Sequence, residues 1–176
     1  MPLNSGANHV REAINGVVFP SGATYDGTTQ IPALQAHISV PMGTVVTDGP
    51  HAFVWGGNVA EARQTMGGPR AQQINTTSPF RVLNHRVSIV VRWGLPSNLT
   101  TQDSVFPVVV DTIIENLRGI PMPVQINDEQ TNRPSTIQII GEEFNTDYGQ
   151  VYAMKDQRYW LYGAKITMAV REVIQQ

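Results

Sequence analysis

Hydrophobic and polar residues alternate most regularly in two stretches of this chain, and both predict β-strands. From Arg81 to Trp93 an apolar side chain or a histidine falls on every second residue, with mostly polar residues between them, which is typical of a strand with one buried face. Trp160 to Arg171 alternates over a longer stretch than the roughly five or six residues of an average strand. A shorter segment, Thr136–Ile140, carries two isoleucines on one face and predicts a third strand.

Between the predicted strands Arg81–Trp93 and Thr136–Ile140, the spacing of the apolar residues changes to that of a helix. From about Ser104 the apolar residues recur every three or four positions, which predicts an amphipathic helix with a wide apolar face. Pro107 is tolerated only near the start of a helix, so Ser104 or Asp103 is the expected N-cap. Gly119 and Pro121 are expected to end the helix.

The part of the chain before Phe80 is rich in turn residues and gives weaker signals. Val10–Val18 predicts a short helix, and Ala52–Ala60 predicts a strand interrupted by Gly56-Gly57. The stretch between them, Phe19–Pro50, is long for a loop of a compact domain, and loops of such length are usually functional or ordered by a partner. We therefore expect residues 19–50 to form an extended interface arm, with Pro121–Pro134 as a second irregular connection.

These elements together predict an α+β fold in a single domain spanning residues 1–176. We expect a mainly antiparallel sheet covered by one long helix, with long loop arms. An unpaired sheet edge, either Arg81–Trp93 or Leu161–Arg171, would be available to accept a strand from another chain.

Composition favours a protein whose surface is covered by a partner. Charged residues make up only 15% of the 176 residues, whereas Asn, Gln and Thr together supply 39 side chains that are less costly to desolvate than ions. The net charge is −2, and Lys and Arg are scattered singly, which argues against a basic stripe for nucleic acid. The absence of cysteine excludes disulfides and thiolate chemistry. We also expect no membrane partner, because no apolar run approaches the roughly 20 residues that span a bilayer.

Candidate chemistry is sparse, and we expect neither an enzyme nor a bound cofactor or metal. The four histidines, His9, His37, His51 and His85, show no metal-binding spacing. His85 lies on the apolar face of its strand and is expected to be packed and hydrogen-bonded, while His37 and His51 are expected to be solvated or at an interface. No phosphate-binding glycine motif, nucleophilic serine motif or plausible carboxylate dyad is found. The tyrosines and Trp160 near the end of the chain suit a core or an interface.

The second half of the chain resembles the tail terminator proteins of long-tailed bacteriophages, especially those that infect actinobacteria. The resemblance consists of a sequence of elements that covers about half the chain. These elements are the strand 85–93, the helix 108–117, the turn Pro121-Met122-Pro123, the segment 135–143 and the closing stretch 157–175.

The resemblance implies a structural virion protein that forms a hexameric ring at the head-proximal end of the tail tube. Such a ring caps the tube and joins the tail to the head connector, so the implied partners are further copies of the chain, the tail tube protein and the head–tail connector protein. DNA would only pass through the lumen, and the protein would be found in the host cytoplasm during assembly and in the virion neck afterwards. We expect subunit contacts at Arg92, Trp93, Tyr148, Arg158, Tyr159 and Arg171.

Two alternatives remain open from the sequence. A head-completion or connector protein of the neck would also form a ring, but it would bind the portal side. A small hydrolase or ligand-binding domain would instead use His51, His85 and the tyrosines.

Overall fold

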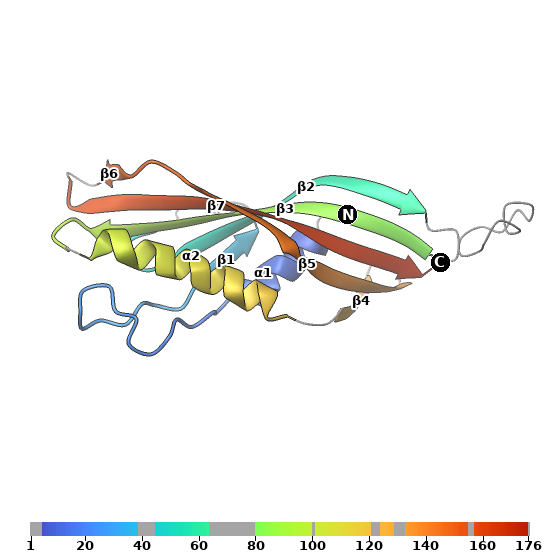
Figure 1. The fold of residues 1–176 in the computed structure, drawn as a ribbon, viewed down its shortest axis with the longest axis horizontal. Coiled ribbons are helices and arrows are strands. Elements are labelled where there is room, and N and C mark those ends of the chain that lie inside the picture. Colours follow the sequence, from blue (N-terminus) through green and yellow to red (C-terminus); the bar gives the residue numbers. More distant parts are fainter. Residues whose placement is uncertain are drawn as a thin grey trace, which may run out of the picture.

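The fold is mostly β-sheet, with two helices against one face of the sheet (Figure 1). The computed structural model describes residues 5–38, 45–63, 80–99, 101–120, 124–128, 133–154 and 157–175. Within these residues the elements, in chain order, are α1 (Ser5–Ile14), β1 (Gln35–Ile38), β2 (His51–Arg63), β3 (Phe80–Pro96), α2 (Gln102–Arg118), β4 (Val124–Asp128), β5 (Arg133–Tyr148), β6 (Tyr152–Met154) and β7 (Tyr159–Gln175).

The seven strands of the described residues form one sheet in the order β1-β2-β3-β7-β5-β4, with β6 continuing beside β7 where β5 ends. All pairings are antiparallel except that of β1 with β2. The long central pair β3 and β7 stays in register from Phe80 opposite Gln175 to Pro96 opposite Tyr159. This pair is therefore the frame on which the other strands are built.

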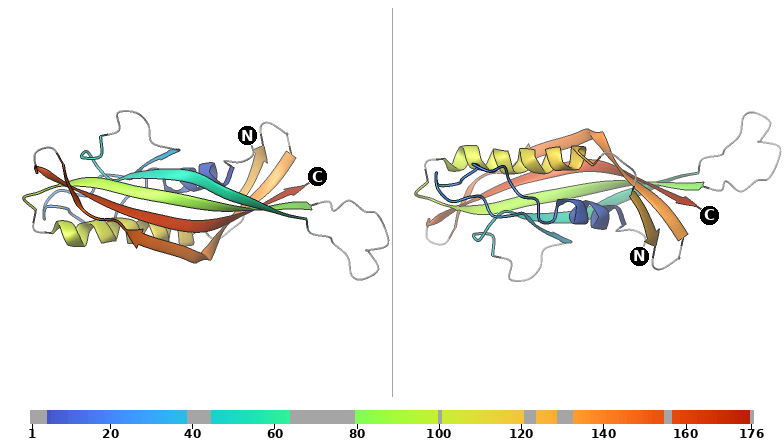
Figure 2. Two further views of the ribbon diagram at one scale, coloured as in Figure 1. Left: turned by 90° about the horizontal axis from the view of Figure 1, so that it is seen from above. Right: turned by 90° about the horizontal axis from the view of Figure 1, so that it is seen from below.

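The predicted fold class, a sheet covered by one long helix, is wrong. The sheet curls into a half-barrel, and both α1 and α2 cover its inner face (Figure 2). The sequence pattern missed β1 and β4 because strands of four and five residues are too short for alternation to be recognised. Both strands lie in segments that the sequence analysis interpreted as loops.

The predicted sheet edges are also wrong. Arg81–Trp93 lies in β3, which pairs with β2 on one side and β7 on the other. Leu161–Arg171 lies in β7, which pairs with β3 on one side and with β5 and β6 on the other. Both are therefore central strands. The edges could not be predicted, because regular alternation reflects burial of one face and does not indicate which strands lie next to a given strand.

Several element boundaries differ from those predicted. The first helix spans Ser5–Ile14 instead of Val10–Val18, because its buried stripe begins at Ala7 and the backbone turns at Gly16, whose φ is +79°. The long helix has its N-cap at Thr101, before the expected Asp103 or Ser104, and ends at Gly119 as predicted. β5 is far longer than the predicted Thr136–Ile140.

The core lies between the helices and the inner face of the sheet. The alternation predicted for the central strands is confirmed: Ile89 and Val91 of β3 and Ile166 of β7 are fully buried. The buried stripe of α2 packs on them and consists of Val105, Phe106, Val109, Val110, Ile113, Ile114 and Leu117. The Tyr162 hydroxyl donates a hydrogen bond of 2.5 Å to Asp103 Oδ1, which ties the first turn of α2 to the sheet.

Part of the segment 19–50 also packs into this core. Phe19, Ile31 and Leu34 are buried, and β1 extends the sheet beside β2. The turn of residues 20–30 is mostly exposed, so a contact between this segment and a neighbouring chain would use that turn. Of the second predicted connection, Pro121–Pro134, residues 124–128 form β4, while residues 121–123 and 129–132 lie outside the described residues.

Candidate functional site

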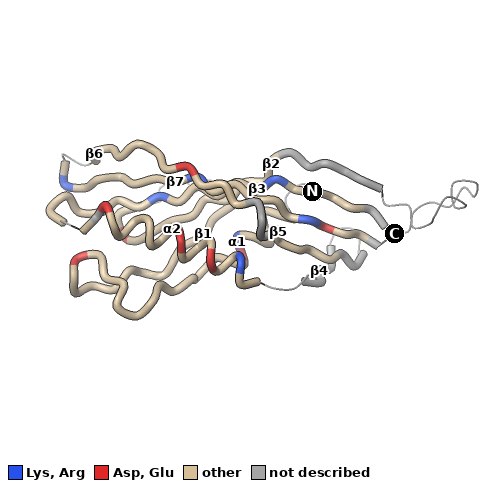
Figure 3. The backbone as a smooth tube through the Cα atoms, viewed as in Figure 1, with Lys and Arg blue, Asp and Glu red and all other residues tan. Residues whose placement is uncertain are grey.

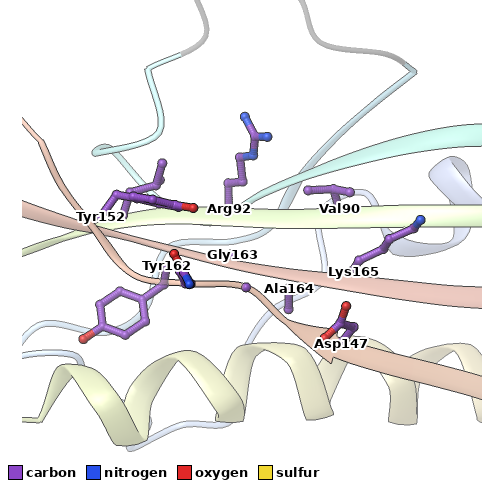
Figure 4. Close-up of a pocket in the computed structure, with 11 residues that line it drawn as sticks. Val90, Arg92, Asp147, Tyr152, Tyr162, Gly163, Ala164 and Lys165 are labelled. Carbon is purple, nitrogen blue, oxygen red and sulfur yellow. The ribbon is translucent and has the colours of Figure 1, made fainter.

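The face of the sheet turned away from α1 and α2 carries the candidate site. Along β3 and β7 every second residue points to this open face, so Arg92 lies opposite Gly163 and Val90 lies opposite Lys165. Figure 4 shows Val90, Arg92 and Lys165 on this side of the sheet, whereas the ring of Tyr162 points toward α2. Alternation in two neighbouring strands thus gathers side chains from sequence positions about 70 residues apart.

A groove with a volume of about 320 Å³ runs over this face. Its lining comes from the four strands β3, β5, β6 and β7 and from the residues between β5 and β6, and it includes Val90, Arg92, Asp147, Tyr152, Leu161 and Lys165. Gly163 lies opposite Arg92 and has no side chain to fill the space between the neighbouring strands, which leaves the hollow. The groove combines an apolar floor with two cationic groups and one carboxylate.

Charge is distributed unequally between the two sides of the molecule (Figure 3). The exposed charged residues described on β3, β5 and β7 are Arg86, Arg92, Lys165, Arg171 and Asp147. Those of α2 are Asp103, Asp111, Glu115 and Arg118. The open face is therefore mainly basic and the helical side mainly acidic. This separation is not visible in the sequence, because the same cations are scattered singly along the chain and only strand pairing brings them together.

The six predicted contact residues do not form one cluster. Arg92 and Arg171 are exposed on the open face, and Arg158 is exposed in the turn before β7. Tyr148 is 49% exposed at the end of β5, with its ring edge-on to that of Phe106.

The other two predicted residues are less accessible. Tyr159 is half-buried opposite Pro96 at the start of β7. Trp93 is only 2% exposed and packs edge-on against Tyr25 in the core, and its role as a contact residue stays a prediction. Its inward position follows from the alternation of β3, which the sequence pattern had already indicated.

A second polar feature joins three side chains beside the groove, where His51 of β2 lies opposite Arg92 of β3. His37 Nε2 lies 3.1 Å from His51 Nδ1, and His51 Nε2 lies 2.8 Å from Asp48 Oδ1. The expectation that His51 is solvated is wrong, because it is 2% exposed and stacks with the rings of His37 and Phe53. Burial, followed by the neighbouring His51, lowers the pKa of His37. The arrangement fixes ring orientation and links the loop before β2 to β1.

The prediction for His85 is confirmed. Its side chain is buried on the inner face, and Nε2 lies 2.8 Å from Glu172 Oε2 of β7. Gly6 of α1 packs directly on the imidazole, since a Cβ at that position would come within 2.9 Å of His85 Cγ. On the same helix, burial lowers the pKa of His9. The pair thus lies where α1 meets the central strands, without access to the open face.

The described residues do not support a metal site or a membrane-spanning helix. No group of three or more His, Asp or Glu side chains is placed there to hold a metal ion. Neither of the two described helices is long and apolar enough to cross a membrane.

Comparison with models of known protein families gives no match, and comparison with curated proteins gives no significant match. The open face with its groove is consequently the feature from which a function has to be inferred.

Proposed function

We propose that this chain is a structural subunit of a bacteriophage neck, a tail terminator that closes into a ring on the head-proximal end of the tail tube. The observation that carries the proposal is the open face of the sheet. A surface with an uncovered groove between Val90 and Leu161, edged by Arg92 and Lys165, is suited to contact with another protein. The order of elements that carries the resemblance to tail terminators supports the same function.

The arrangement of β3, α2, β5 and β7 adds to this support. These elements contain the four longer segments on which the resemblance depends, and β3, β7 and β5 are adjacent in the sheet. They form a structural unit in which one helix packs on three long strands. The resembling half of the chain is thus a contiguous part of the fold, as expected if it were the conserved framework of a ring subunit.

The proposed mechanism is geometric and makes or breaks no covalent bond. In a ring each subunit uses two different patches, one for each neighbour. One face of the finished ring would match the end of the tail tube, while the opposite face would not repeat the tube surface and would instead bind the head–tail connector. Growth of the tube would stop for this reason, and DNA would pass through the lumen without specific contacts.

The direct test is to add the purified protein to tail tube protein during polymerisation and to measure tube lengths by negative-stain electron microscopy. We expect shorter tubes with extra density at one end as the ratio of terminator to tube protein rises. Tubes that continue to lengthen at saturating protein would contradict the proposal. If the protein instead formed rings that bound only purified portal complexes, it would be a head-completion protein.

A further inference from the structure

The structure leaves two surfaces whose chemistry is complementary, one on each side of the molecule. The first is the groove of the open face, edged by two cations, Arg92 and Lys165, and one carboxylate, Asp147, and floored by Val90 and Leu161. The second is an outward stripe of α2 formed by Val108, Asp111 and Glu115, which recur at helical spacing. We name these the groove and the α2 stripe.

We propose that the α2 stripe of one copy docks into the groove of the next copy, and that this contact closes the ring. The inference rests on the proposed function, since it identifies the surfaces by which the ring subunits would meet. The occupant of the groove is a second copy of this chain, because the chain itself carries the surface that complements it.

The charges of the two surfaces are complementary. Asp111 and Glu115 are exposed one helical turn apart, and Arg92 and Lys165 are exposed on neighbouring strands. None of these four makes an ion pair with any residue that the structure describes. Residues one turn apart on a helix are about 5–6 Å apart at Cβ, and diagonal neighbours across strands are about 7–8 Å apart. The two carboxylates can thus face the two cations at the same time.

Each of the two surfaces also carries apolar residues beside its charges. Val108 is 40% exposed and lies one turn before Asp111 on the same side of α2. In the groove Val90 and Leu161 are placed beside the cations in a similar way, and Gly163 leaves room between them. An apolar centre with charges at its border is the usual composition of a protein interface.

The positions of the two surfaces in the fold favour a contact between copies. The α2 stripe and the groove belong to different sides of one molecule, so they cannot meet within a chain and must join copies head to tail. Seen from above, α2 lies along the β5 side of the sheet instead of under its middle (Figure 2). The two surfaces are therefore not directly opposite each other, and a head-to-tail contact between them forms a ring when the rotation between successive copies closes.

Paired charge reversals test the contact. The groove variant carries Arg92→Glu and Lys165→Glu, and the α2 variant carries Asp111→Lys and Glu115→Lys. All four positions are exposed, so circular dichroism spectra should match that of the unaltered protein. Native mass spectrometry measures the subunit concentration below which rings dissociate. For each variant alone this concentration should be at least about tenfold higher than for the unaltered protein, because the contact is weaker.

Mixing the two variants in equal amounts provides the decisive readout. In an alternating ring every groove again meets an α2 stripe of opposite charge, so rings with equal numbers of both variants should form. The two variants change the net charge in opposite directions, which excludes a general charge effect. Arg86→Glu, on the same face but outside the groove, is the matched control and should leave the ring intact.

A cross-link gives an independent test, because the chain contains no cysteine. Val90→Cys and Val108→Cys on separate copies should form a covalent dimer on oxidation, whereas two copies of the same variant should not. If the unaltered protein forms rings but the charge reversals have no effect, or mixing does not restore rings, the proposed contact is wrong and the ring remains. If the unaltered protein stays monomeric, the proposed function itself fails.

Discussion

The buried pair between His85 and Glu172 offers a quantitative test of how the helices are held to the sheet. Both residues are less than 5% exposed, and their hydrogen bond of 2.8 Å joins β3 to β7 under α1. Removing one partner of a buried ion pair destabilises a protein by about 3–5 kcal/mol. Glu172→Ala should therefore remove a large part of a total stability of about 5–15 kcal/mol and lower Tm by about 6–20 °C at about 2–4 °C per kcal/mol.

Urea unfolding followed by tryptophan fluorescence measures this loss at a fixed subunit concentration. His85→Leu should cost a similar amount, while the double variant His85→Leu/Glu172→Leu should cost much less than the two single losses together, because both single variants lose the same hydrogen bond. Glu172→Gln keeps an acceptor for the imidazole and should lie between the unaltered protein and Glu172→Ala. A loss below about 1 kcal/mol for Glu172→Ala, or single losses that simply add, would refute the reasoning. Arg171→Ala, exposed on the same strand, is the control.

Three further predictions concern the sheet and its covering helices. Gly57→Ala should destabilise the protein by about 1–3 kcal/mol, since a Cβ there would lie 2.8 Å from a carbonyl oxygen of β3, whereas Gly149→Ala, with 3.6 Å of space, should be nearly neutral in the same urea titration. Ile166→Asp should abolish folding by circular dichroism because it places a charge in the core, and Arg171→Glu should fold normally; a folded Ile166→Asp would contradict the assigned faces of β7. Burial lowers the pKa of His9 below 6.5, so the unfolded chain binds more protons and stability should fall as the pH drops from about 7 to 5; an equally steep fall in His9→Gln would exclude this cause.

The central part of the fold follows from sequence pattern, and its periphery does not. Strands β3 and β7 and helix α2 are long enough for their periods to stand out, so their buried faces were predicted correctly at Ile89, Ile166 and Ile113. The short β1 and β4 depend on pairing with distant segments, which no local pattern reveals. The helix α1 begins earlier than predicted because its apolar stripe is short and follows directly on residues with no clear signal.

The candidate site was harder to predict than the fold. Arg92 and Lys165 are 73 positions apart in the sequence, and only the register of β3 with β7 places them on one groove. The sequence did assign each of them to the polar face of its strand. The hydrogen bonds of His51 could not be foreseen, because its partners His37 and Asp48 lie in a region of turns without regular spacing.

We propose that this chain acts by closing into a ring with copies of itself. Native mass spectrometry of the unaltered protein at micromolar concentration, combined with class averages viewed down the symmetry axis, tests it most directly. We expect a single closed species of several subunits, six times the 19.4 kDa chain mass for a hexamer, with a central opening. A particle of one chain mass that persists as the concentration is raised would contradict it.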